Sequence, residues 1–165
     1  LCACALSLFA LGATANAAPA DQALTLEPLR PPVSAALAVN AQQRHALDLL
    51  NADRAAHGLP PLRFNIALSR LAENYAQDMI KRDFFSHTSP EGLTPFERMR
   101  KHGIPFNYAG ENLAFNASIR DAQQAFMDSP SHRANILNKN YTQVGIGVKE
   151  GRNGRTYVVQ EFSDG

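Results

Sequence analysis

Apolar residues recur at helical spacing in the middle of the chain. One stripe follows the i, i+3, i+4, i+7 pattern of an amphipathic helix, and Asn65 precedes it as a suitable N-cap. The stripe consists of Leu68, Leu71, Ala72, Tyr75, Ala76 and Met79. Because an isolated apolar stripe is unstable in water, this predicted helix must cover a hydrophobic core.

Three further helices are predicted from shorter signals. Residues 41–57 favour helix and end at Gly58, a common C-terminal stop. Thr94 begins a capping box with proline at the first helical position, and the short helix closes at Gly103. Ser118 begins the third of these helices, whose apolar side chains are expected to be buried.

The end of the chain follows the two-residue period of β-strands. Residues 144–148 alternate, residues 157–162 are rich in β-branched and aromatic side chains, and 151–154 have turn composition. We expect a β-hairpin at the centre of a sheet. Since helices fill the middle of the chain and strands its end, the predicted class is α+β, with a mainly antiparallel sheet and helices on its faces.

The first forty residues differ from the rest. Residues 1–17 carry no charge and end in a small-residue pattern suited to signal peptidase, so we interpret them as a signal peptide. Residues 18–40 are rich in alanine and proline and are interpreted as a disordered tail. The compact domain is then expected over 41–165, exported to the periplasm or the medium.

Charge and composition argue against two kinds of partner, nucleic acid and a membrane span. The formal net charge is +1 and the basic residues are scattered, so no basic stripe for nucleic acid is expected. The apolar run in the leader is too short for a stable membrane span. Both cysteines, Cys2 and Cys4, precede the predicted cleavage site, so the mature domain is expected to be stabilised by its core and not by disulfides.

Candidate chemistry lies in three short stretches, 85–90, 110–112 and 129–137, each expected on a loop or a helix start. They contain His87, Glu111 and His132. Imidazole and carboxylate groups bind divalent metals or transfer protons near neutral pH. If the three converge, they form one pocket.

These stretches resemble signature sequences of the CAP superfamily, which groups cysteine-rich secretory proteins, antigen 5 and pathogenesis-related 1 proteins, and specifically its bacterial SCP-like branch. Further similarity covers residues 50–62 and 141–145. The resemblance implies a three-layer α-β-α sandwich whose cleft holds two histidines and two acids, with a divalent metal such as zinc in some members. His87, Glu111 and His132 match three positions, and Asp128 is the acid nearest to the fourth.

Three uses of this cleft remain open from the residues. The trio could be a polar network that braces its loops, a metal pocket with a binding role, or a catalytic site. No activated nucleophile supports the last. We therefore expect a domain that binds a small molecule, lipid, cell-wall fragment or peptide. The alternative is a metal-dependent hydrolase, a protease or nuclease, in which Glu111 would take a proton from metal-bound water.

Overall fold

The computed structural model describes residues 39–151 and 153–165, which form five helices and a four-stranded sheet. The helices are α1 (Ala41–Ala56), α2 (Ile66–Arg82), α3 (Pro95–Lys101), α4 (Ile119–Asp128) and α5 (Pro130–Ile136). The strands are β1 (Arg63–Phe64), β2 (Ala109–Asn116), β3 (Gln143–Glu150) and β4 (Thr156–Ser163). The predicted α+β class is confirmed.

The sheet has the order β1-β3-β4-β2. The β3–β4 hairpin occupies its centre, as the sequence predicts, and β2 pairs antiparallel with β4. The two-residue strand β1 runs parallel to β3, so the sheet is mixed but mainly antiparallel. Within the described residues, β2 is paired on one side only and forms a free edge.

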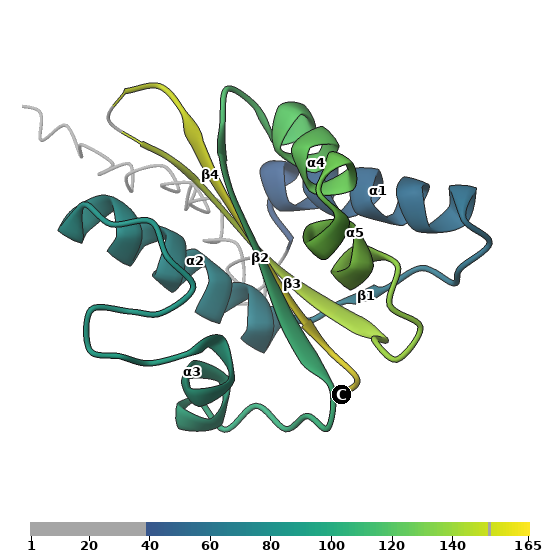
Figure 1. Cartoon of the computed structure of the whole chain (residues 1–165), viewed down its shortest axis with the longest axis horizontal. Coiled ribbons are helices and arrows are strands. Elements are labelled where there is room, and N and C mark those ends of the chain that lie inside the picture. Colours follow the sequence, from purple (N-terminus) through teal and green to yellow (C-terminus); the bar gives the residue numbers. More distant parts are fainter. Residues whose placement is uncertain (1–38, 152) are drawn as a thin grey trace, which may run out of the picture. The chain divides into compact units, whose positions relative to one another are not determined.

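The helices form two layers around the sheet, with α2 and α3 on one face and α1, α4 and α5 on the other (Figure 1). Alternate residues of each strand serve the two layers. On β4, Val158 and Phe162 belong to the cluster beneath α1, α4 and α5, whereas Val159 packs against α2. The result is the expected α-β-α sandwich.

Two glycines let α2 lie directly on β3. A Cβ atom added at Gly145 would overlap the main chain of Leu68, and one added at Gly147 would overlap that of Ala72. On the opposite face of β3, side chains such as Ile146 pack into the core cluster beneath α1, α4 and α5. Glycine is therefore needed here for close approach of helix and strand.

The predicted helix starts agree with the structure. Asn65 caps α2, Ser118 caps α4, and Thr94 forms a capping box with Glu97 at the start of α3. The helix α1 begins at Ala41, ends at Ala56, and is followed by Gly58 with a positive φ of 70°. These ends follow from side-chain oxygens that accept the first free N–H groups and from glycine's freedom in the left-handed region.

Two strands were not predicted. β1 is too short to show a period, and β2 carries polar residues that hide its alternation. The expectation that residues 110–112 lie on a loop is wrong, because they are part of β2. The predicted signal peptide (1–17) and most of the predicted tail (18–40) lie outside the described residues. In the part of the chain that is described, no helix combines the length and apolarity of a membrane span.

Candidate functional site

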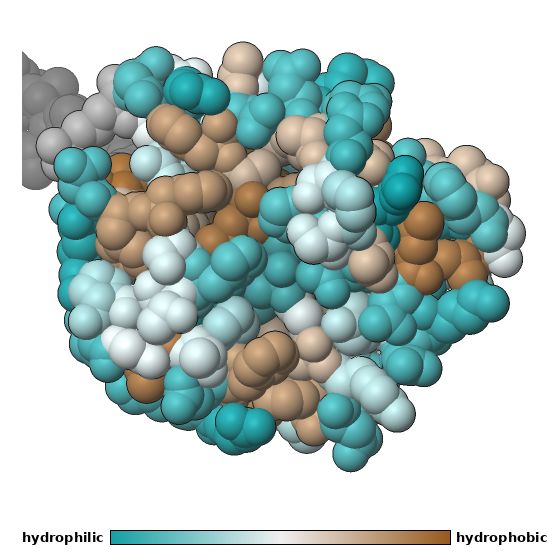
Figure 2. All heavy atoms as spheres, in the orientation of Figure 1, coloured by the Kyte–Doolittle hydropathy of each residue, from teal (hydrophilic) through white to brown (hydrophobic). Residues whose placement is uncertain are grey.

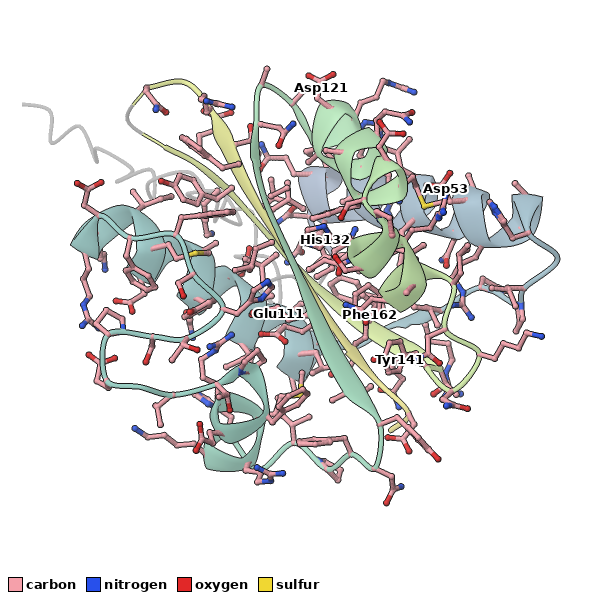
Figure 3. All side chains as sticks on the ribbon, viewed as in Figure 1. Asp53, Glu111, Asp121, His132, Tyr141 and Phe162 are labelled. Atoms are coloured by element: carbon pink, nitrogen blue, oxygen red, sulfur yellow. The ribbon has the colours of Figure 1, made fainter. Side chains whose placement is uncertain are left out.

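The three predicted stretches meet at the free edge of β2. The loop between α2 and α3 supplies His87, β2 supplies Glu111, and α5 supplies His132. Figure 3 labels Glu111 and His132 on the two sides of β2, near the middle of the face shown. The site therefore straddles the edge strand and draws one imidazole from each side of the sheet.

Glu111 orients His87 directly. Its Oε1 atom lies 2.7 Å from Nδ1 of His87, and its side chain is only 1% exposed. The His87 side chain, in contrast, is 52% exposed. A buried carboxylate that accepts the Nδ1 proton fixes the tautomer and leaves Nε2 as the outward-facing atom, able to accept a hydrogen bond or bind a metal.

Arg98 on α3 holds the other side of the carboxylate. Its guanidinium donates to Oε2 of Glu111 and, from Nη1, to the carbonyl oxygens of His87 at 2.7 Å and Leu93 at 3.2 Å. It also lies over the Tyr75 ring, 3.5 Å from the ring centroid. One buried cation thus fixes the carboxylate and the main chain of the loop that carries His87.

A second acid lies beneath this pair. Glu161 on β4 is the direct cross-strand partner of Glu111, is completely buried, and has its Oε1 atom 3.6 Å from Nη2 of Arg98. Burial first, and then the negative charge of Glu111, raise the pKa of Glu161 well above its usual value. Since burial and the neighbouring carboxylate both disfavour a further negative charge here, the structure favours a protonated Glu161.

His132 faces a less polar environment. Its ring lies 5.3 Å from the Phe126 ring, centroid to centroid, and makes no hydrogen bond to residues 39–151 or 153–165. Burial, and to a lesser degree the positive charge of His87, lower the pKa of His132. His132 is therefore biased toward its neutral form.

An amide network ties α5 to β2. The Asn112 side chain donates to the carbonyl oxygen of His132 at 3.1 Å, and Asn135 donates to the carbonyl oxygen of Glu111 at 3.2 Å and to Oδ1 of Asn112 at 2.9 Å. Asn135 thus ties α5 to the main chain of β2. These bonds position His132 relative to Glu111.

A hollow opens beside His132 along the outer edge of β2. Its volume is about 400 Å³. It is lined by Phe85, Leu113, Ala114, Phe115, Asn116, Ala125, Phe126, Ser129 and His132. In Figure 2 the centre of this face is teal, with a brown hydrophobic patch above and to the left of it. The His132 imidazole therefore borders a largely apolar hollow.

Asp128 does not join this group. It is exposed at the end of α4, where Oδ1 accepts a hydrogen bond from Gln124 at 3.0 Å. The acid that accompanies Glu111 is instead Glu161. Neither Arg98 nor Glu161 was identified from the sequence. Glu161 could have been noticed in the sequence, because it is a charged residue on the same face as Val159 in a strand predicted to be central. No sequence feature distinguished Arg98 from the other arginines.

A divalent metal would need ligand atoms that are not already engaged in hydrogen bonds within the protein. Among the described residues no three or more His, Cys, Asp or Glu side chains cluster as a metal site. Both oxygens of Glu111 are engaged by His87 and Arg98. Of the three predicted ligands, only the imidazoles of His87 and His132 would therefore remain for an ion, with Glu111 hydrogen-bonded behind His87.

Comparisons with known proteins agree with this architecture. The model of the cysteine-rich secretory protein (CAP) family matches residues 47–162. The Bacillus subtilis protein YkwD is 38% identical over 138 residues, which are 83% of this chain and 52% of YkwD. The B. subtilis membrane protein YlbC is 32% identical over 121 residues, 73% of this chain and 34% of YlbC. The chain thus spans about half of YkwD and about a third of YlbC.

Two solved structures of bacterial proteins have folds similar to that of this chain. An extracellular protein containing an SCP domain from Bacillus anthracis superposes with a TM-score of 0.70 and 30% identity, covering 85% of this chain and 45% of that one. An outer surface protein from Borrelia burgdorferi superposes with a TM-score of 0.70 and 22% identity, covering 76% of this chain and 94% of that one. The second similarity concerns the fold alone.

Proposed function

The chain belongs to the cysteine-rich secretory protein (CAP) family, and from that premise we propose that it is an exported binding domain whose ligand contacts His87 and His132. The observation that carries the proposal is the unequal burial of the Glu111–His87 pair. A buried carboxylate holds an imidazole that is itself half exposed, so His87 is oriented toward solvent with one nitrogen available.

The surroundings suggest the kind of ligand. The imidazoles supply hydrogen-bonding or metal-binding nitrogens, and the adjacent hollow supplies apolar walls that include Phe85 and Phe126. Binding sites typically combine a largely apolar concavity with a few oriented polar groups. We propose a ligand with one polar group for the imidazoles and an apolar part for the hollow, drawn from small molecules, lipids, cell-wall fragments or peptides.

A divalent metal such as zinc would be held by His87 and His132 if this chain uses one. When bound, such an ion would supply a positive charge that attracts an anionic or carbonyl group of the ligand. Glu111 would keep the His87 ring in its metal-binding tautomer by accepting the Nδ1 proton. The low polarity around His132 favours the neutral imidazole that a metal requires.

Binding is preferred to metal-dependent hydrolysis. In the hydrolase alternative Glu111 acts as a general base, which needs a carboxylate oxygen within reach of the attacking water. Here one oxygen accepts from His87, the other from Arg98, and the group is almost completely buried. No feature of the site favours protease or nuclease chemistry.

Export is part of the proposal. It is supported by the composition of residues 1–17 and by family membership, and the B. anthracis neighbour is an extracellular protein. Periplasm and external medium are both consistent with these observations.

The proposal is tested by following the His87 and His132 ring signals by NMR during addition of three probes. The probes are dodecanoate, N-acetylmuramyl dipeptide and a blocked pentapeptide. We expect at least one probe to shift both rings, and His87→Ala or His132→Ala to weaken its binding about tenfold, equivalent to one or two lost hydrogen bonds. Asp128→Ala is the matched control and should bind as the unmodified protein does.

Two results would contradict the binding proposal. One is the absence of any ring shift at millimolar concentrations of all three probes. The other is equal binding by the unmodified protein and both histidine variants, which would put the binding surface elsewhere.

A further inference from the structure

The outer edge of β2 has main-chain groups, at the floor of the hollow beside His132, that no other described residue pairs with. Two carbonyl oxygens of β2 accept hydrogen bonds from side chains and therefore point away from β4. The carbonyl of Glu111 accepts from Asn135, and the carbonyl of Phe115 accepts from Arg155 at 2.9 Å. In an antiparallel strand the N–H and C=O of one residue point to the same side, and alternate residues point the same way. Leu113, midway between them, must therefore direct both groups outward.

Leu113 differs from its two neighbours in this series. No residue among 39–151 and 153–165 donates to its carbonyl oxygen or accepts from its N–H on that side. The residue lines the hollow and is 6% exposed, so these groups lie at the floor and not on a convex surface. Unpaired main-chain groups with little access to water are costly, and a ligand that pairs with them gains affinity.

The walls of the hollow are apolar and come from both layers of the sandwich. Phe85, 49% exposed, packs against Phe115 with ring centroids 6.3 Å apart and forms one wall. Ala125 and Phe126 of α4 form the other. An exposed phenylalanine beside unpaired strand edge is a feature of binding surfaces, because a monomeric protein otherwise covers such groups.

We propose that this hollow binds a short extended peptide segment, which adds to the edge of β2 by pairing its main chain with Leu113 and places an apolar side chain between Phe85 and Phe126. The proposal rests on the proposed function, since it names the ligand class for the same region. An acyl chain would fit the apolar walls, but it has no donor and acceptor to match the N–H and C=O of Leu113. A peptide in the β conformation has both in the correct spacing.

Asn135 and Arg155 limit the length of the pairing. They occupy the carbonyl oxygens of Glu111 and Phe115, two residues to either side of Leu113. A bound peptide residue therefore forms two hydrogen bonds with Leu113, one to its N–H and one to its C=O. Its neighbours can accept from the N–H groups of Glu111 and Phe115, whose carbonyl oxygens are already engaged. His132, at the border of the hollow, lies within the same pocket lining and is available to a polar group of the peptide.

The test uses the ¹⁵N-labelled protein and the blocked peptide acetyl-Thr-Val-Phe-Val-Thr-amide, chosen for its β propensity and central aromatic ring. At saturation we expect hydrogen exchange of the Leu113 amide to slow about tenfold, the size expected from one new hydrogen bond. The same peptide with its three central amide nitrogens methylated should not slow exchange. Dodecanoate should not slow it either.

Variants on one helix provide the matched control. Ala125→Phe fills the hollow and should weaken peptide binding about tenfold, whereas Gln124→Phe adds the same ring on a position outside the hollow and should not. Both positions are exposed on α4, so both variants are expected to fold.

The possible outcomes are distinct. Unchanged Leu113 exchange with the peptide, equal binding of the methylated peptide, or slowing by dodecanoate alone would overturn the proposal. Concentration-dependent protection of Leu113 without peptide would overturn it in favour of a second copy at this edge. A probe that shifts the His87 and His132 rings while leaving Leu113 unchanged refutes the peptide and keeps the proposed function. Protection of Leu113 with unshifted rings supports the peptide site and contradicts the role of the imidazoles.

Discussion

Glu111 and Glu161 face each other across the β2–β4 pair on one face of the sheet, and both side chains are buried. The outward orientation of the Glu111 carbonyl makes this a non-hydrogen-bonded pair, in which opposing side chains lie closest. Two like charges so placed would destabilise the sheet. Protonation of Glu161 and the guanidinium of Arg98 remove the repulsion, and Glu111 orients His87.

Glu161 should make the protein less stable as the pH rises. Its pKa is raised in the folded state, so the stabilisation is complete below the ordinary value of 4.5 and is lost as the pH rises from there through the raised pKa. In Glu161→Gln the side chain keeps nearly the same shape and stays neutral at every pH. We expect its free energy of unfolding to fall less than that of the unmodified protein between about pH 5 and pH 8, as measured by urea denaturation.

Glu150→Gln is the control for this experiment, because Glu150 is exposed at the end of β3. Its pH dependence should match that of the unmodified protein. Parallel curves for the unmodified protein and Glu161→Gln would show that Glu161 does not change protonation in this range.

Removal of the Arg98 side chain should be among the most destabilising single changes. Arg98→Ala leaves Glu111 and Glu161 buried without a cation and frees the loop carbonyls of His87 and Leu93. Loss of one partner of a buried ion pair costs about 3–5 kcal/mol. Denaturant unfolding of Arg98→Ala and of Lys101→Ala, an exposed position on the same helix, measures the difference. A loss for Arg98→Ala no larger than that for Lys101→Ala would contradict the assigned role.

The sequence predicted the architecture well because its signals were local. Asn65, Thr94 and Ser118 cap helices with their own side chains, and the hairpin carries its period and turn within twenty-odd residues. Strand β2 was missed because Glu111 and Asn112 are both buried, one on each face, where alternation would require one of them to be apolar. A strand with polar groups on both faces has no periodic signature.

The site was predicted only in part for a related reason. His87, Glu111 and His132 were identifiable through short motifs, but the charges that control them lie elsewhere in the chain. Arg98 reaches Glu111 only once α3 packs beside β2, and Glu161 meets it through strand register. Such contacts depend on tertiary packing and register, which one sequence does not specify. Asp128 was nominated by proximity along the chain, and the helical geometry directs it to solvent.

His132 should titrate below the ordinary histidine value of 6.5, because burial and the charge of His87 lower its pKa. In His87→Ala the charge is gone and the site is more open to water, so both changes should move the His132 midpoint upward. Ring resonances followed by NMR against pH measure this midpoint, with His45→Ala on the exposed side of α1 as control. A midpoint that is the same with and without His87 would mean that the two rings do not interact.

The close packing of α2 on β3 should not tolerate a methyl group. A Cβ at Gly147 would overlap the main chain of Ala72, so Gly147→Ala must displace the helix or the strand. Overpacking of this kind costs about 1–3 kcal/mol. Thermal unfolding of Gly147→Ala compared with Glu150→Ala on the same strand measures the cost. Equal melting temperatures would show that the contact is looser than the structure indicates.

The central claim is that His87 and His132 open onto one shared binding site with Glu111 behind His87. The most direct measurement is a zinc titration in which the ring ¹⁵N signals of all five histidines are followed by NMR, with magnesium and calcium as comparison ions. The account predicts that the Nε2 signal of His87 and a ring nitrogen signal of His132 change together and saturate at one zinc concentration, while the other three histidines do not follow them. Changes in only one of the two rings, or two separate saturation points, would contradict it.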